Sequence, residues 1–116
     1  WRMLQQKEPE DYVIATGKMT SVRKFIEMSA IALNWEGIEW EGKGINEIGR
    51  RRDNGQIVIK ISKDFYRPAE VEQLLGDASK AHRKLGWQPN HNLNELVMEM
   101  IDNDKKDALY ELNRNL

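Results

Sequence analysis

The feature that most limits the fold of this chain is a continuous apolar run followed at once by a helical pattern. The run Tyr12–Ala15 is rich in β-branched residues and ends at Thr16 and Gly17. Such runs are typical of a strand buried on both faces, as in a parallel sheet. Thr20 or Ser21 can then cap a helix with apolar residues at i, i+3 and i+4 spacing, namely Val22, Phe25, Ile26, Ala30 and Leu33. The order strand, turn, helix favours a crossover unit.

The middle of the chain predicts two further strands. Residues 38–41 alternate as a half-buried strand does, and Asp53-Asn54-Gly55 is a strong tight-turn signal before a strand from Ile57 to Ile61. Between them, residues 42–52 hold glycines and three consecutive arginines, so we expect an exposed loop there.

Two helices are expected in the last third of the chain. Asp77 is a good N-cap for a short helix that ends at Leu85, and Gly86 stands where a left-handed C-terminal cap belongs. The final helix should be the longest, starting at Asn92 with Glu95 in the capping-box position. We therefore predict an α/β fold with a small mixed sheet and helices, in one domain spanning residues 1–116.

Composition excludes several classes of function. The net charge of -1 provides no field that would attract nucleic acid or an acidic membrane. The chain has no cysteine, and His82 and His91 cannot form a zinc site by themselves. No apolar run approaches the roughly 20 residues of a membrane helix. We expect a cytoplasmic protein that binds no metal.

Because Trp1–Gln6 already has a helix-compatible pattern, we also expect the chain to be part of a longer protein.

The best candidate for ligand binding is the segment Tyr66-Arg67-Pro68-Ala69-Glu70. A guanidinium can hold two phosphate oxygens at once, and a carboxylate can accept from both hydroxyls of a ribose. Pro68 biases Arg67 away from helical geometry, which would place the pair at a junction between loop and helix. From these residues alone, a surface salt bridge at a helix start is the favoured interpretation.

Other charged segments favour simpler interpretations. Arg50-Arg51-Arg52 lies among acidic residues and suits a solvated loop better than a nucleic-acid site. Ser21 with Arg23 and Lys24 could bind an anion, yet helix capping alone explains Ser21. The sequence contains no Ser/His/Asp set and no Gly-rich phosphate loop, so no catalytic residue is assigned.

Several motifs together resemble one family. They are Asp11-Tyr12-Val13-Ile14-Ala15-Thr16-Gly17, Ser21-Val22-Arg23, Ile38-Glu39-Trp40-Glu41-Gly42, Tyr66-Arg67-Pro68-Ala69-Glu70-Val71 and Leu85-Gly86-Trp87-Gln88-Pro89. From Trp1 to about Asp104 the chain resembles the C-terminal part of the GDP-mannose 4,6-dehydratase family, which belongs to the extended short-chain dehydrogenases. It departs from the usual family pattern at Lys24, where a glutamate is more common.

The resemblance implies a larger parent enzyme, a lyase of GDP-fucose and deoxysugar biosynthesis. In it, an N-terminal Rossmann domain would bind NADP and this C-terminal domain would bind GDP-mannose. Arg67 and Glu70 would contact the diphosphate and the ribose. The family converts GDP-mannose to GDP-4-keto-6-deoxymannose with loss of water, using a Tyr-x-x-x-Lys pair that neither Tyr12 nor Tyr66 begins. We therefore expect an inactive fragment of an enzyme that is a homo-oligomer when complete.

Two alternatives stay open at the level of sequence. The chain could be part of another nucleotide-sugar epimerase or dehydratase, because Leu85-Gly86-Trp87-Gln88-Pro89 alone is common among extended short-chain dehydrogenases. It could also be a free-standing, non-catalytic nucleotide-binding module.

Overall fold

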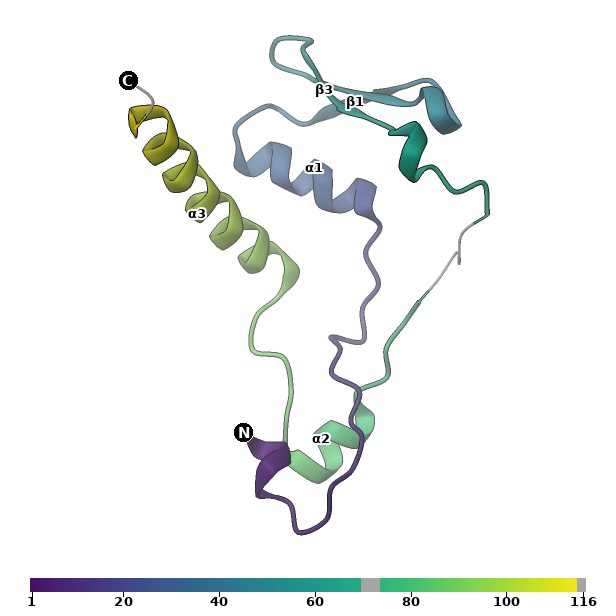
Figure 1. Ribbon diagram of the computed structural model, residues 1–116, viewed down its shortest axis with the longest axis vertical. Helices are drawn as coiled ribbons and strands as arrows, with labels where there is room; N and C mark the ends of the chain where they lie inside the picture. The colour runs from purple at the N-terminus through teal and green to yellow at the C-terminus, as the bar shows by residue number, and fades with distance from the viewer. Residues whose placement is uncertain (70–73, 115–116) are drawn as a thin grey trace. The chain divides into compact units, whose positions relative to one another are not determined.

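The computed structural model describes residues 1–69 and 74–114. They form two compact units (Figure 1). One unit holds residues 1–20 and the described part of 71–92, and the other holds residues 21–69 and 93–114.

The larger unit contains an antiparallel sheet of three strands in the order β1-β2-β3. The strands are β1 (Ile38–Glu41), β2 (Ile48–Arg51) and β3 (Ile57–Lys60). Two short 3₁₀ helices flank them, η2 (Gly44–Asn46) between β1 and β2, and η3 (Lys63–Phe65) after β3. In the register, Gly49 of β2 stands opposite Trp40 on one side and Ile59 on the other.

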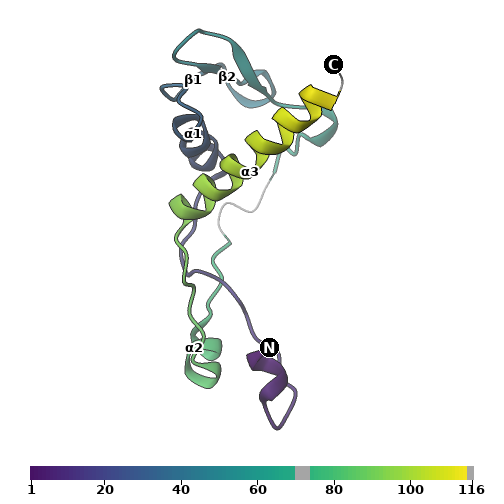
Figure 2. The ribbon, with the colours of Figure 1, turned by 90° about the vertical axis from the view of Figure 1, so that its left-hand side faces the viewer.

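Two α-helices complete the larger unit. Helix α1 (Val22–Ala32) contacts both β1 and α3 (Leu93–Arg114), as Figure 1 and Figure 2 show. Three almost fully buried apolar residues come from the three elements that meet, namely Ala30 of α1, Ile38 of β1 and Val97 of α3. A small core therefore joins the sheet to both helices.

The smaller unit contains η1 (Arg2–Gln5) and α2 (Ser79–Leu85). Arg2 donates a hydrogen bond of 3.2 Å to the Leu85 carbonyl and another to the Gly86 carbonyl at the end of α2. Lys80 and Lys84 of α2 both pair with Glu10, at 2.9 and 2.5 Å. Polar contacts thus hold this unit together, around the fully buried Ala81.

Several sequence predictions are confirmed. The Ser21 hydroxyl caps α1 by accepting from the Lys24 backbone N–H at 3.1 Å. Gly86 ends α2 in the left-handed conformation with φ 59°. The final helix is the longest, and residues 53–55 form the turn of the β2–β3 hairpin.

Three local predictions are wrong. Residues 12–15 form no strand, and Val13 and Ile14 are each 52% exposed, because the described residues offer the run no neighbouring strand. Residues 42–52 are not a loop, since they contain η2 and β2. The described sheet is antiparallel throughout and not mixed, although the α/β class is confirmed.

Asp77 acts differently from its expected role as the N-cap of α2. Ala78 is the N-cap residue and makes no side-chain cap hydrogen bond. Asp77 lies one position before Ala78, and its Oδ1 accepts from the backbone N–H of Ser79, the first residue of α2, at 2.9 Å.

No helix in the described ranges combines the length and the apolar character required to cross a bilayer. The same residues bring together no group of His, Asp or Glu side chains able to hold a metal ion.

Candidate functional site

Arg67 lies in an exposed segment that leaves the sheet after β3. Helix η3 turns the chain, and Tyr66 then has extended backbone angles, with φ −69° and ψ 125°. Arg67 and Pro68 follow, both exposed. Pro68 disfavours helical backbone angles at Arg67. The guanidinium is thus carried on a short segment anchored at one end by the sheet.

Tyr66 brings this segment close to the turn between β1 and β2. A Cβ placed on Gly44 would lie 3.6 Å from the Tyr66 hydroxyl oxygen, so the phenol lies beside η2. The turn itself is tight. Gly42 has φ 83°, and a Cβ there would come within 2.5 Å of the Asn46 carbonyl oxygen.

Glu70, the second residue of the predicted pair, lies outside the described residues. The structure therefore gives the place of Arg67 only, and the pairing of the two side chains around one ligand stays a prediction.

The arginine run has structural partners. Arg50 Nε donates to Glu41 on the adjacent strand at 3.1 Å. Arg51 donates to Asp53 through Nε at 2.9 Å and stacks on Trp35, with 4.5 Å from its guanidinium carbon to the ring centroid. This bond to Arg51 lowers the pKa of Asp53 below its ordinary value. Arg50 and Arg51 thus support the hairpin. The expected solvated loop is wrong, because both residues belong to β2.

The anion site considered at the start of α1 is also explained by packing. Ser21 uses its hydroxyl to cap the helix. Arg23 pairs with Glu47 and lies over the Trp40 ring, 4.2 Å from the centroid. These side chains tie α1 to the sheet.

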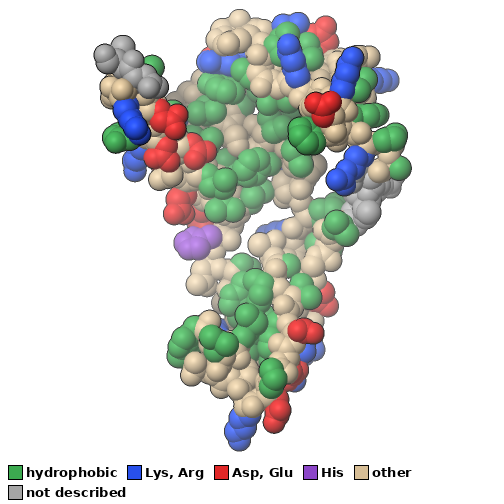
Figure 3. Space-filling model, in the orientation of Figure 1, with side chains coloured by type: hydrophobic (Ala, Val, Ile, Leu, Met, Phe, Trp, Pro, Cys, Tyr) green, Lys and Arg blue, Asp and Glu red, His purple; other side chains and the backbone are tan. Residues whose placement is uncertain are grey.

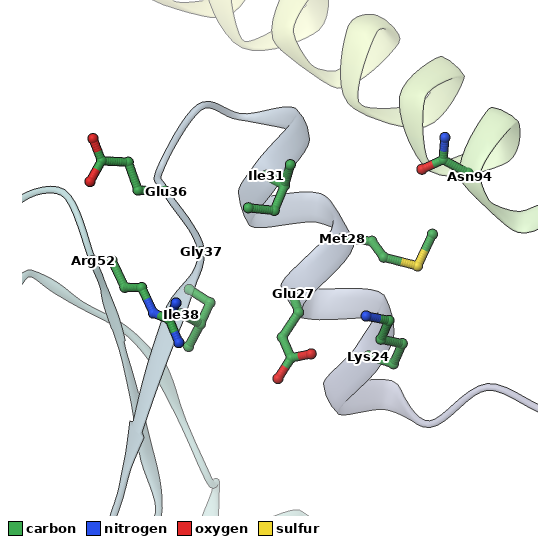
Figure 4. Close-up of a pocket in the computed structure, with 9 residues that line it drawn as sticks. All are labelled: Lys24, Glu27, Met28, Ile31, Glu36, Gly37, Ile38, Arg52 and Asn94. Carbon is green, nitrogen blue, oxygen red and sulfur yellow. The ribbon is translucent and has the colours of Figure 1, made fainter.

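The larger unit also contains a hollow of about 350 Å³, which no sequence pattern had indicated. Figure 4 shows its walls, which include Glu27 and Ile31 of α1, Arg52 after β2 and Asn94 of α3. Its polar groups come from elements far apart in sequence. No spacing rule could have grouped them, and they include no paired nucleophile and base.

A second hollow, of about 240 Å³, lies within the smaller unit. Asp77, His82 and Trp87 are among its lining residues. The pKa of Asp77 is lowered because the Ser79 backbone N–H donates to its carboxylate. This carboxylate is therefore tied to the start of α2 and is poorly suited to accept a proton near neutral pH.

None of the tyrosines in the sequence can begin a Tyr-x-x-x-Lys pair. The fourth residue after Tyr12 is Thr16, after Tyr66 it is Glu70, and after Tyr110 it is Arg114. The given sequence therefore contains no Tyr-x-x-x-Lys pair.

An α/β chain with a small antiparallel sheet and these helices fits part of an extended short-chain dehydrogenase. The family model described as GDP-mannose 4,6 dehydratase matches residues 1–100. The chain belongs to this family.

Sequence identity to named relatives supports that assignment. The chain is 49% identical over 104 residues to GDP-mannose 4,6 dehydratase 2 of Caenorhabditis elegans and to GDP-mannose 4,6 dehydratase of Cricetulus griseus, with 90% of this chain covered in each. It is 46% identical over 118 aligned positions to GDP-mannose 4,6-dehydratase of Yersinia enterocolitica, with 93% covered. The chain spans 27%, 28% and 32% of the lengths of these relatives.

Proposed function

We propose that this chain forms the GDP-sugar-binding, C-terminal part of a GDP-mannose 4,6-dehydratase, a lyase that converts GDP-mannose to GDP-4-keto-6-deoxymannose with loss of water. The observation that carries the proposal is the family match, which includes the exposed Arg67 and the Glu70 that follows it. The match favours this family over the alternative of another nucleotide-sugar epimerase or dehydratase.

Arg67 has the chemistry to bind the diphosphate. Its planar guanidinium donates two parallel hydrogen bonds, which a lysine ammonium cannot do with the same geometry. Its exposed position after η3 leaves a ligand room to approach. Glu70 would accept hydrogen bonds from the ribose hydroxyls, three residues further along the chain.

The described residues offer no phosphate-binding loop for NADP, the cofactor of the family. Such a loop needs a strand, closely spaced glycines and then a helix whose N-terminus faces the phosphates. Gly42 and Gly44 do follow β1, but Gly44 begins the 3₁₀ helix η2 of three residues, which leads into β2. We therefore assign NADP to an N-terminal domain of the parent enzyme, and we assign catalysis to residues outside this chain.

The proposal predicts that the 116-residue chain alone has no dehydratase activity. A measurable turnover of GDP-mannose by this chain would contradict that prediction. A homo-oligomeric complete enzyme and a cytoplasmic location also stay predictions.

Calorimetric titration of the complete dehydratase with GDP-mannose tests the role of Arg67. Loss of a bidentate, charge-assisted contact costs roughly 1.5–3 kcal/mol, so Arg67→Ala should raise Kd about 10- to 150-fold. Arg67→Lys should recover only part of this loss, because it keeps the charge but not the fork.

Lys63→Ala is the matched control, because it removes an exposed positive charge from the same segment, on η3. It should leave Kd nearly unchanged. An Arg67→Ala enzyme with wild-type affinity would refute the assignment. UDP-glucose, titrated in parallel, should bind much more weakly if the site is specific for guanine.

A further inference from the structure

A cluster of side chains joins the first turn of α1 to the sheet. Arg23 pairs with Glu47, and its guanidinium carbon lies 4.2 Å from the centroid of the Trp40 ring. On the same helix, Glu27 accepts a hydrogen bond of 3.1 Å from the indole N–H of Trp40. The pair of Arg23 and Glu47 is partly shielded, with side chains 44% and 23% exposed. Two residues of α1 thus fix the position of Trp40, and one of them also holds Glu47.

Glu47 belongs to a rigid turn. Its backbone N–H donates to the Gly44 carbonyl at 3.1 Å and so closes η2. Gly42 begins the turn in a conformation with φ 83°, where any side chain would meet the Asn46 carbonyl. A displacement of Glu47 would therefore move the whole turn and not only one side chain.

The turn lies beside the segment that carries Arg67. The Tyr66 hydroxyl would be 3.6 Å from a Cβ placed on Gly44, and Tyr66 directly precedes Arg67 in the sequence. Figure 1 shows η2 and η3 near one another at one end of the sheet, which agrees with this proximity. A series of neighbouring groups thus leads from Arg23 through Glu47, Gly44 and Tyr66 to Arg67.

We propose that Arg23 and Glu47 are positioning residues for the nucleotide-sugar site: they hold the η2 turn against Tyr66 and thereby set where Arg67 meets the diphosphate. This inference rests on the proposed role of Arg67. Its physical basis is that a bidentate contact tolerates displacements of only about 0.5 Å, so the position of the neighbouring turn affects the geometry at Arg67.

A double-mutant cycle in the complete dehydratase tests the inference. Arg23→Met keeps an aliphatic stem over Trp40 but removes the charge, and Glu47→Gln keeps the size of Glu47. Each should raise the Kd for GDP-mannose about 3- to 10-fold when Arg67 is present, and less than about 2-fold in the Arg67→Ala background. Steady-state kinetics should show a raised KM with little change in kcat, because a loss of folded enzyme would lower kcat instead.

Arg50→Ala is the matched control. It breaks the ion pair of 3.1 Å with Glu41 in the same sheet but does not touch the path to Arg67. We expect Arg50→Ala to leave the Kd for GDP-mannose unchanged in both backgrounds. The midpoint of thermal unfolding should be measured for every variant.

The outcomes separate the two proposals. If Arg23→Met and Glu47→Gln weaken binding equally in both backgrounds, or not at all, the positioning role is wrong while the role of Arg67 stands. If Arg67→Ala itself leaves Kd unchanged, both are wrong.

Discussion

Gly49 shows how one residue determines the packing of the sheet. It is buried at the centre of β2, and a Cβ at this position would lie 2.9 Å from Ile59 Cγ1 and 3.1 Å from Ile38 Cγ2. Those distances are shorter than ordinary carbon contacts, which are about 3.5–4.0 Å. The absence of a side chain therefore lets the isoleucines of β1 and β3 approach across β2.

We expect Gly49→Ala to destabilise the chain by about 1–3 kcal/mol, because overpacking must displace Ile59 or Ile38. Urea denaturation of the 116-residue chain measures the change. Gly55→Asn is the control, since Gly55 has φ 72° with no atom near its Cβ position, and asparagine tolerates that conformation. Equal midpoints for Gly49→Ala and the unmodified chain would refute the packing argument.

Glu10 makes the smaller unit sensitive to acid. Hydrogen bonds from Lys84 and then Lys80 lower its pKa below the ordinary value of 4.5, and the pKa of Lys84 is raised in return. A carboxylate whose folded-state pKa is lowered stabilises the fold above its unfolded pKa, and that contribution is lost as pH falls through the folded value.

The stability of the chain should therefore decrease below pH 4.5 more steeply than in a Glu10→Gln variant. Thermal melts of both proteins between pH 7 and pH 3 measure the difference. Parallel pH profiles would show that this ion cluster adds nothing to stability. Glu8→Gln controls for the general effect of removing a nearby carboxylate, because the pKa of Glu10 depends on the two lysines.

At the level of elements, the start of α1 has an N-cap side chain but no capping-box partner for it. Ser21 accepts from the Lys24 N–H, and the first turn has no acidic residue. A glutamate at position 24 would return a hydrogen bond to the Ser21 N–H and would also interact favourably with the positive end of the helix.

We predict that Lys24→Glu stabilises the chain by about 0.5–1 kcal/mol and that Ser21→Ala destabilises it by about 0.5–2 kcal/mol. Urea denaturation measures both changes. Ser21→Gly is the informative control, because glycine at an N-cap costs only a few tenths of a kcal/mol. A Lys24→Glu chain less stable than the original would show that Lys24 makes a larger contribution elsewhere.

The helices and the hairpin turn were predictable because their signals are local. Ser21, Gly86 and Asp53-Asn54-Gly55 act within a few residues of themselves. Strand β2 was missed because Gly49 and two arginines hide its β character, and only its cross-strand neighbours explain those residues. The run Tyr12–Ala15 gave the opposite error, since a strand depends on a neighbour that sequence periodicity cannot supply.

Some features of the candidate site were likewise predictable from local sequence, and others were not. The position of Arg67 after a strand and before a proline could be read from the sequence. The link from Arg23 to Arg67 could not, because the pairing of Arg23 with Glu47 and the proximity of Tyr66 to Gly44 each join residues far apart in the sequence. The 350 Å³ hollow was missed for the same reason.

On the scale of the whole molecule, the smaller unit exposes much of its apolar surface. Its large exposed hydrophobic residues include Trp1, Leu4, Val13, Ile14, Leu74 and Leu75. Trp1 and Leu4 are each 85% exposed, whereas Ala81 is the one buried apolar residue found in the described part of this unit. The green surface in the lower half of Figure 3 includes side chains of this kind. Apolar surface exposed on this scale favours association.

We predict that the 116-residue chain self-associates through the smaller unit and unfolds at a lower temperature than its length suggests. Size-exclusion chromatography with light scattering should show a mass that rises with concentration. Leu4→Glu should shift the equilibrium toward monomer, because a charge at an apolar contact costs desolvation energy. Leu112→Glu, at a site 61% exposed on α3, should have little effect.

A monomer at all concentrations with a sharp, reversible transition at high temperature would contradict the prediction. If both variants reduce association equally, the contact surface is not confined to the smaller unit.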